Sequence, residues 1–203
     1  RARGDTVRID AAVDGRLEGY EVEGLRGWAV SLPGRLAWER LRGRINGALF
    51  DGVGRFDFSD PGGAEFWLEG DVADVDLSRG LVPQTALPPT GGHGRLWLHR
   101  REAVDETEVS GWLADGFIAE VPFDTCHVRV DAARGVARLA PVRLRYRDLT
   151  AVLTGEADTS GTFLGELDLQ ARDLTQLPAG WGAPRLAGRA QGRGVVVGRD
   201  PVY

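Results

Sequence analysis

Histidine is the first residue type to consider for metal binding, and the chain has three: His93, His99 and His127. His93 and His99 are six residues apart in the segment GGHGRLWLHRR, which alternates like a β-strand. On a strand this spacing separates the two residues by about 20 Å, so their side chains cannot bind the same ion. We therefore expect surface histidines and no metal site.

Acidic residues could instead bind calcium, and the segment DVADVD contains Asp71, Asp74 and Asp76. These residues lack the Asp-x-Asp-x-Asp-Gly spacing and the closing glutamate of an EF-hand loop. We interpret them as outward-facing strand residues, and we expect no metal or other cofactor.

Nucleophilic catalysis finds no support in the sequence either. There is no Gly-x-Ser-x-Gly motif, and the segment DTSG (158–161) fits a hairpin turn better. The single cysteine, Cys126, alternates with Val128 on an apolar face, which favours a buried, inert thiol over a catalytic one. No glycine-rich loop leads from a strand into a helix, so a nucleotide cofactor is not expected. We predict a non-enzymatic protein.

Arginine and tryptophan are mixed in the histidine-containing segment, at Arg95, Trp97, Arg100 and Arg101. Such a mixture occurs on surfaces that bind single-stranded nucleic acids. The chain carries a net charge of −5, whereas proteins that bind nucleic acids usually carry a basic excess. We therefore predict solvated arginines on an edge strand, and no nucleic-acid partner.

The elements that hold these residues are predicted to be short β-strands. Glycine accounts for 29 of the 203 residues, and both glycine and proline interrupt helices. Apolar and polar residues alternate in most of the chain, as they do in an antiparallel sheet that is wet on one side. The clearest strand segments are TVRIDAAV (6–13), GWAVSL (27–32), FIAEVPF (117–123), CHVRV (126–130) and VRLRY (142–146).

Turns are predicted where aspartate, proline or serine precedes glycine. These positions are Asp14-Gly15, Pro33-Gly34, Asp51-Gly52, Asp60 to Gly63, Asp115-Gly116 and Ser160-Gly161. The segment RLAWERLRGRINGALF (35–50) fits both a helix and a strand. Because Gly43 and Gly47 would each cost a helix about 1 kcal/mol, we interpret the segment as a strand with bends.

The chain also contains a weak internal repeat. Residues 54–83 align with residues 155–178, and each copy reads as strand, turn, strand and then Asp-Leu. The turn between the two strands is four residues shorter in the second copy. A period near 90–100 residues built from hairpins indicates a stacked array of two β units. We predict a first unit at 1–83, a Pro/Gly-rich joint at 84–92 and a second unit at 93–203, as a fragment of a longer protein.

The segment LTAVLTGEADTSGTFLGELDLQARDLTQLP (149–178) resembles the AsmA-like and TamB-like proteins of the diderm bacterial envelope. The resemblance rests on a strand that ends in a Gly-x-x-Asp turn, a strand with alternating apolar residues, and an Asp-Leu element at Asp173. FWLEGDVADVDLSRGLVPQTALPPTGGHGRLWLHR (66–100) repeats this style at Asp76.

This resemblance implies a long, curled β-sheet that carries phospholipid along an apolar groove in the periplasm, between the inner and outer membranes. It implies phospholipid acyl chains as partners and a role in outer-membrane lipid transport or assembly. It also allows an outer-membrane β-barrel as a protein partner and places a membrane anchor outside these residues.

From both lines of reasoning we predict an all-β fold, an elongated, curled antiparallel sheet built from repeated hairpin units. An apolar sheet face must pack on a second sheet, close on itself or bind lipid, because large exposed apolar patches are rare. The alternative is therefore a closed β-sandwich or β-barrel that serves as a binding or adhesion module. The residues expected on the apolar face, as a lipid groove, are Val7, Ile9, Trp28, Val30, Phe56, Phe66, Leu68, Leu98, Phe117, Val121, Phe123, Val128, Val130, Val142, Leu144, Leu167 and Leu169.

Overall fold

The computed structural model describes residues 7–17, 20–76, 90–118, 121–158, 162–177 and 187–199. These residues form twelve strands and two short 3-10 helices. The strands are β1 (Val7–Leu17), β2 (Tyr20–Leu32), β3 (Arg35–Ile45), β4 (Ala48–Asp57), β5 (Glu65–Ala73), β6 (Thr90–Arg101), β7 (Glu106–Ile118), β8 (Val121–Ala133), β9 (Val136–Tyr146), β10 (Leu149–Asp158), β11 (Thr162–Ala171) and β12 (Ala190–Arg199). The helices are η2 (Glu102–Val104) and η3 (Leu174–Gln176).

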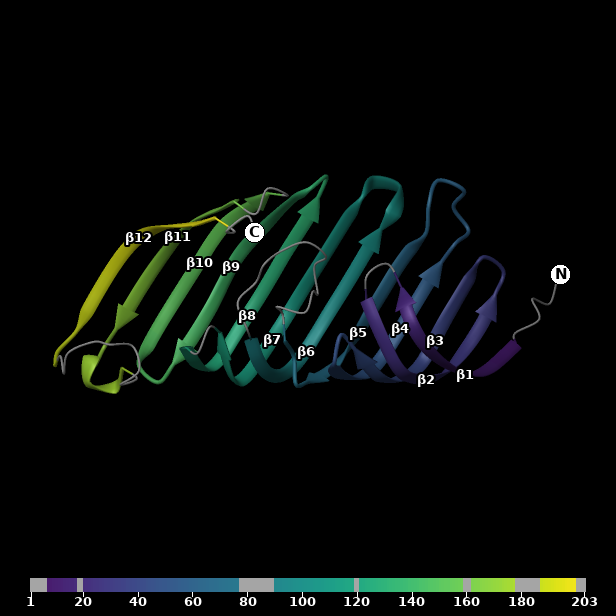
Figure 1. The fold of residues 1–203 in the computed structure, drawn as a ribbon, viewed down its shortest axis with the longest axis horizontal. Coiled ribbons are helices and arrows are strands. Elements are labelled where there is room, and N and C mark those ends of the chain that lie inside the picture. Colours follow the sequence, from purple (N-terminus) through teal and green to yellow (C-terminus); the bar gives the residue numbers. More distant parts are fainter. Residues whose placement is uncertain are drawn as a thin grey trace.

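All twelve strands belong to one antiparallel sheet, in which each strand pairs with the next along the chain. Figure 1 shows this order from β1 at the right to β12 at the left. The prediction of an all-β fold with an elongated, curled antiparallel sheet is confirmed. The described strands β1 and β12 lie at opposite ends and do not pair with each other, so the alternative of a closed sandwich or barrel is wrong for the described residues.

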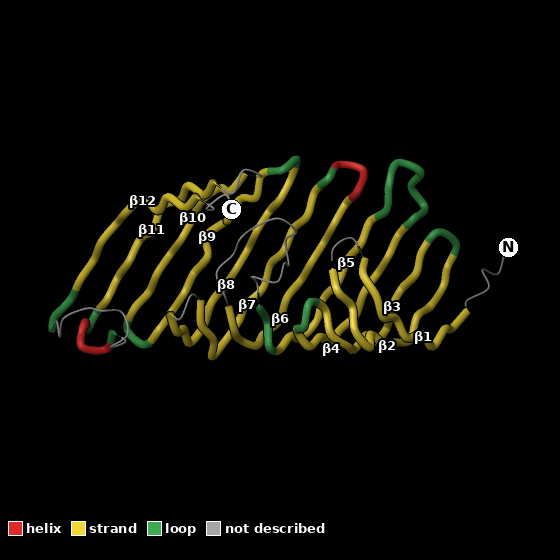
Figure 2. The backbone as a smooth tube through the Cα atoms, in the orientation of Figure 1, coloured by secondary structure: helices red, strands yellow, loops and turns green. Residues whose placement is uncertain are grey.

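The sheet buries one of its faces although no second sheet covers it within the described ranges. Leu113 is only 1% exposed and Phe123 only 2%. A flat single layer would leave both faces open to water, so the strands must curve around these side chains, as the bent strands in Figure 2 show. We call this the inner face and the opposite one the outer face. The core cluster of the inner face consists of Leu41, Phe50, Leu68, Val72, Val75, Leu96, Leu113, Phe123 and Cys126.

Facing glycines let neighbouring strands approach closely on the inner face. Gly52 of β4 is opposite Gly70 of β5, and a Cβ on Gly52 would lie 2.1 Å from the carbonyl oxygen of Glu69. The ring of Phe50 lies over both glycines and fills the space that their side chains would need. Gly155 and Gly165 form the same arrangement under Phe163. The high glycine content therefore serves the curvature of the sheet as well as its turns.

Three of the predicted turns lie inside strands and are wrong. Asp14-Gly15 lies in β1, where the pairing with β2 shifts register, and Asp115-Gly116 lies in β7 beside a register shift against β6. Asp115 has a φ of 46°. A bulge can need the same positive φ as a turn, so an Asp-Gly pair does not distinguish the two. Asp51-Gly52 lies within β4, where Gly52 is needed for close strand approach.

The predicted turns at Pro33-Gly34 and at Asp60 to Gly63 are confirmed, and Ser160-Gly161 lies outside the described residues. Three tight turns among the described residues were missed, at Asn46-Gly47, Arg134-Gly135 and Arg147-Asp148. Asn46, Gly47, Arg134, Gly135 and Arg147 have positive φ. The segment 35–50 is extended rather than helical, as predicted, with a bulge between Trp38 and Leu41. It is not one strand, because β3 ends at Ile45 and β4 begins at Ala48 after the turn at Asn46-Gly47.

Another segment predicted as one strand also holds parts of two. The segment FIAEVPF (117–123) contains the end of β7 at Ile118 and the start of β8 at Val121, and these two residues pair across a hairpin. Apolar residues continue through this hairpin without a change in the alternating pattern, so the sequence gives no sign of it.

The two copies of the internal repeat pair in equivalent registers. Gly54 is opposite Leu68 in the first copy, and the matching Gly155 is opposite Gly165 in the second. The sheet continues without a break from β5 to β6, so both predicted units share one sheet. Of the predicted joint, 84–89 lie outside the described residues and 90–92 begin β6. The division into two units stays a prediction.

Candidate functional site

An apolar cavity of about 390 Å³ lies on the inner face of β1 to β6. Its volume falls in the range of about 300–1,000 Å³ that small-molecule sites usually have. The largest side chains that line it are Trp38, Phe50, Phe56 and Phe66. The other lining residues are also apolar except Asp14, Gly15, Asn46 and Asp76. The cavity therefore offers contact area for an apolar ligand and few polar groups that could orient a polar one.

Strand alternation and one bulge bring these side chains to the same face. In β5, Phe66, Leu68 and Val72 follow the two-residue period of a strand. In β3, Trp38 and Leu41 both face the cavity although they are three residues apart. The bulge between them shifts the alternation by one residue. The near-helical spacing in segment 35–50 is thus the sequence signal of a bulged strand.

Eleven of the predicted groove residues lie on the inner face. Phe56, Phe66, Leu68 and Leu98 line the cavity; Phe123 belongs to the core cluster, and Val128, Val142 and Leu144 pack against it. Val130 is opposite the buried Val109. Leu167 is opposite Leu153, which also pairs with Val142. Leu169 is opposite Ala151, which also pairs with Leu144. Facing residues in an antiparallel pair point to the same side. The contact of these residues with lipid stays a prediction.

Trp28, Val30 and Phe117 lie on the outer face, which differs from the predicted placement. Ala29 is opposite Trp38 and is 1% exposed, so its two neighbours point the other way. Phe117 is 44% exposed. The alternation of β2 is regular from Arg26 to Leu32, so it groups Trp28 with Val30 but does not say which face of the strand is buried.

Three further groove residues cannot be assigned to a face. In the backbone register Val7 is opposite Ser31, Ile9 is opposite Ala29 and Val121 is opposite Ile118. Their side chains lie outside the described part of the structure.

Sequence reasoning missed several residues that enclose the cavity, above all Trp38, Phe50 and Leu96. Trp38 lies in segment 35–50, whose pattern fits both a helix and a strand. Phe50 lies next to Asp51-Gly52, which was predicted to be a turn. Leu96 stands between arginine and tryptophan in a segment interpreted as an exposed edge strand, whereas β6 pairs on both sides, with β5 and β7.

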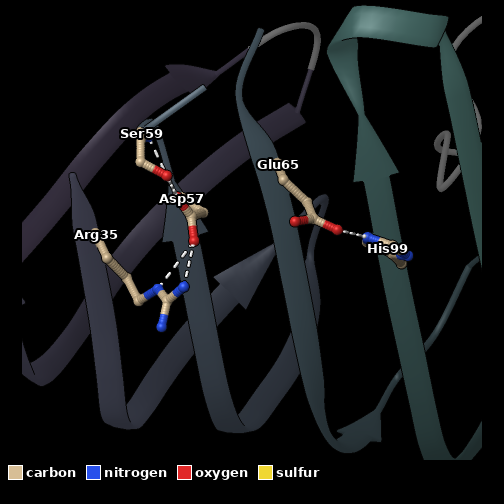
Figure 3. Close-up of polar contacts among 5 residues, drawn as sticks. All are labelled: Arg35, Asp57, Ser59, Glu65 and His99. Carbon is tan, nitrogen blue, oxygen red and sulfur yellow. Dashed lines mark hydrogen bonds and ion pairs between the residues drawn. The ribbon is translucent and has the colours of Figure 1, made fainter. Parts of the chain in front are cut away.

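The outer face carries hydrogen bonds and ion pairs between neighbouring strands, some of which Figure 3 shows. Nε and Nη2 of Arg35 donate to Oδ2 of Asp57 at 2.9 and 2.7 Å, and the hydroxyl of Ser59 donates to Oδ1 of the same carboxylate. Nε2 of His99 lies 2.6 Å from Oε1 of Glu65. The hydrogen bonds from Ser59 and Arg35 lower the pKa of Asp57 to about 2.

Replacing Asp57 with asparagine should reduce thermal stability at neutral pH but not near pH 2. The pKa of Asp57 is lower in the folded protein than its ordinary value of 3.8. Its carboxylate therefore stabilises the fold above that value, and the contribution is lost as the pH falls through about 2. Circular dichroism melts from pH 7 to pH 2 of the native chain and of Asp57→Asn measure the difference.

The matched variant Ser59→Ala removes the largest cause of the lowered pKa and keeps the carboxylate. In this variant the stabilising contribution should disappear at a higher pH than in the native chain. If the difference in melting temperature between the native chain and Asp57→Asn stayed constant down to pH 2, the lowered pKa of Asp57 would be contradicted.

The single thiol is enclosed in the core cluster. Cys126 is 3% exposed, and burial raises its pKa to about 11. The thiolate is the nucleophilic form, so the folded chain presents little of it near neutral pH. The predicted burial of Cys126 is confirmed.

Cys126 should therefore react slowly with iodoacetamide in the folded protein at pH 8. A rise in pKa from 9 to about 11 lowers the thiolate fraction about 100-fold, and burial restricts access further. The alkylated fraction over time, followed by intact-mass spectrometry in buffer and in 8 M urea, measures the ratio of the two rates. Equal rates in buffer and in urea would show that the core opens readily.

The histidines and acidic residues do not assemble into a metal site among the described residues. Nε2 of His93 lies 3.8 Å from Oδ2 of Asp115, whereas His99 contacts Glu65. The part of the chain that the structure describes also has no helix with the length and apolar character needed to cross a membrane.

Comparison with known proteins found no matching family model, no matching curated protein and no matching solved structure. The geometry of the inner and outer faces is therefore the basis for a functional proposal.

Proposed function

We propose that the inner face binds phospholipid acyl chains, and that the chain is a non-enzymatic segment of a periplasmic protein that conducts phospholipid between membranes. The observation that carries this proposal is the 390 Å³ cavity with its apolar lining. An acyl chain is an apolar ligand that needs contact area and no specific polar partner. The periplasmic setting, the role in outer-membrane lipid transport or assembly and an outer-membrane β-barrel partner rest on the resemblance of segment 149–178 to envelope proteins.

The expected affinity suits a lipid that must be released again. Each buried methylene group gains about 0.8 kcal/mol, so ten of them would gain about 8 kcal/mol. Association costs about 4–15 kcal/mol in lost freedom of motion. The two values are similar in size, which favours exchangeable binding over permanent capture. Because the gain grows with each methylene, longer chains should bind more tightly than short ones.

The inner face extends beyond the cavity, which supports movement of lipid along the sheet. Leu98 of β6 is opposite Val109 of β7, Val109 is opposite Val130 of β8, and Val130 is opposite Leu139 of β9. These side chains form one apolar row across four strands, starting at the cavity. A lipid tail held at β5 and β6 would therefore meet further apolar contacts toward β9.

Native mass spectrometry of the delipidated chain tests the proposal. The protein is incubated with phosphatidylglycerol or phosphatidylethanolamine, and the mass of each bound species is read from the intact complex. We expect saturable uptake that increases with acyl-chain length from about 8 to 16 carbons, since each methylene adds about 0.8 kcal/mol. A delipidated chain that is monomeric, stable and unable to take up either phospholipid would refute the proposal.

A further inference from the structure

A second hollow lies on the outer face, on the opposite side of the sheet from the apolar cavity. Its volume is about 490 Å³, and β2 and β3 provide its lining. The side chains that line it come from Arg26, Trp28, Arg40 and Arg42, and the other lining residues are glycines. Three cationic side chains line this hollow, whereas the cavity on the inner face is lined mainly by apolar side chains.

The strand register places like charges side by side in this hollow. Arg26 is opposite Arg42, and Trp28 is opposite Arg40. Facing residues of an antiparallel pair have Cβ atoms about 5 Å apart, and like charges at that spacing destabilise a sheet unless an anion compensates them. The two guanidinium groups of Arg26 and Arg42 are thus close enough to reach the oxygens of one small anion.

One carboxylate pairs with the cluster through an ion pair between described residues. Nε of Arg42 donates to Oδ2 of Asp51 at 2.7 Å, and Arg42 and Arg40 both contribute to lowering the pKa of Asp51. No hydrogen bond or ion pair between described residues occupies the guanidinium group of Arg26 or of Arg40. Asp10 of β1 is opposite Trp28 in the register, but its side chain lies outside the described part. Arg42 and Arg40 therefore share the carboxylate of Asp51, and Arg26 adds a third cation to the lining of the hollow.

Bulges on both strands shape this part of the sheet. The pairing of β2 with β3 shifts between Glu23 and Arg26 and again between Trp28 and Ala29, and Gly24 has a φ of 56°. The pairing of β3 with β4 shifts between Trp38 and Leu41. Bulges re-aim side chains and are common beside functional sites. Here they direct three arginines and a tryptophan to one place while Ala29 and Leu41 remain buried on the inner face.

We propose that this hollow binds a phosphate group, with Arg26, Arg40 and Arg42 donating to its oxygens. Guanidinium groups match phosphate because their N–H groups form parallel, charge-assisted hydrogen bonds. Trp28, 44% exposed, lines the hollow beside the arginines. The phosphate can come from a soluble phosphate ester or from a lipid headgroup at a membrane surface. This site does not depend on acyl-chain binding by the inner face.

Two binding experiments with one set of variants test the phosphate site. Calorimetric titration with inorganic phosphate and glycerol 3-phosphate measures binding of soluble phosphate. Sedimentation with vesicles of phosphatidylglycerol or of phosphatidylcholine measures binding of headgroups. The variant Arg26→Gln/Arg40→Gln removes two cations from the hollow. The control Arg138→Gln/Arg193→Gln removes two from the outer face of β9 and β12, where they pair with Glu156 and Asp168.

We expect the native chain and the control to bind phosphate, and Arg26→Gln/Arg40→Gln to bind it at least about tenfold more weakly. Binding of glycerol 3-phosphate would identify a soluble source, and binding of phosphatidylglycerol vesicles alone would identify a headgroup. Equal losses in both double variants, or no binding of any phosphate probe, would overturn the proposal. Uptake of phospholipid by the inner face, measured by native mass spectrometry, should be unchanged in Arg26→Gln/Arg40→Gln, so failure of one site is distinguishable from failure of the other.

Discussion

Replacing Leu113 with alanine is expected to lower the free energy of unfolding by about 2–5 kcal/mol. Leu113 is 1% exposed in β7, opposite Gly94 of β6 and Cys126 of β8. Gly94 has no side chain that could move into the space left by the leucine, so a cavity would remain. Urea unfolding of both proteins at pH 7, followed by circular dichroism, measures the difference.

The matched control is Leu164→Ala, which removes the same atoms from the outer face of β11. Leu164 is 59% exposed, and its substitution should change the free energy of unfolding by no more than about 0.5 kcal/mol. The contrast between the two leucines depends on curvature, since a flat sheet would expose both of its faces. Equal, small effects at both positions would mean that the sheet does not curl around its inner face in solution.

Replacing Phe66 with glutamate is expected to abolish phospholipid uptake while the sheet remains folded. Phe66 is half-buried in β5 and lines the apolar cavity. A carboxylate there removes apolar contact area, and an acyl chain beside it would desolvate an unpaired charge at a cost of several kcal/mol. Bound phospholipid in native mass spectra, compared at equal protein concentration, should fall at least about tenfold, which corresponds to 1.4 kcal/mol.

The matched control is Leu49→Glu, in the neighbouring strand β4. Leu49 is 42% exposed and points to the outer face, opposite Arg44. The control introduces the same charge into the neighbouring strand without entering the cavity, so it should take up phospholipid like the native chain. Circular dichroism melts verify that both variants are folded. Equal uptake by Phe66→Glu and the native chain would exclude the cavity as the lipid site.

The fold class could be predicted because alternation and glycine content are properties of the sequence itself. The strands at 126–130 and 142–146 lie where their alternation places them, and Arg143 and Arg145 are exposed on the outer face. The internal repeat also pointed to real structure, since Gly54 and Gly155 occupy equivalent positions in two hairpins. These features depend on local residue order, which a single sequence contains.

The faces of several strands could not be predicted because alternation does not say which face is buried and because bulges shift it. Trp28 and Val30 fit an apolar stripe in the sequence, yet Ala29 between them is the buried residue, and both larger side chains point to the outer face. The opposite happens at Trp38 and Leu41, whose spacing does not suit a regular strand although both face the cavity. The arginine-lined hollow was missed for the same reason, since its residues converge only through strand pairing.

Turn prediction failed where glycine served another purpose. Gly52 is required because Gly70 and the backbone of Glu69 lie too close for any side chain. In the sequence this position reads as Asp-Gly, the strongest short signal for a hairpin. Curvature of the sheet, which creates both the buried core and the cavity, arises from such close approaches between distant residues and leaves no local pattern.

The most direct test of lipid binding by the inner face is to map where a bound lipid tail lies. A phosphatidylcholine that carries a photoreactive diazirine in its acyl chain is bound to the delipidated chain and activated with light, and the labelled residues are identified by peptide mass spectrometry. We expect labels on cavity residues of β3 to β6, such as Trp38, Phe66 and Leu98. Labels confined to exposed apolar residues of the outer face, such as Val195 and Val197, or no labels at all, would contradict it.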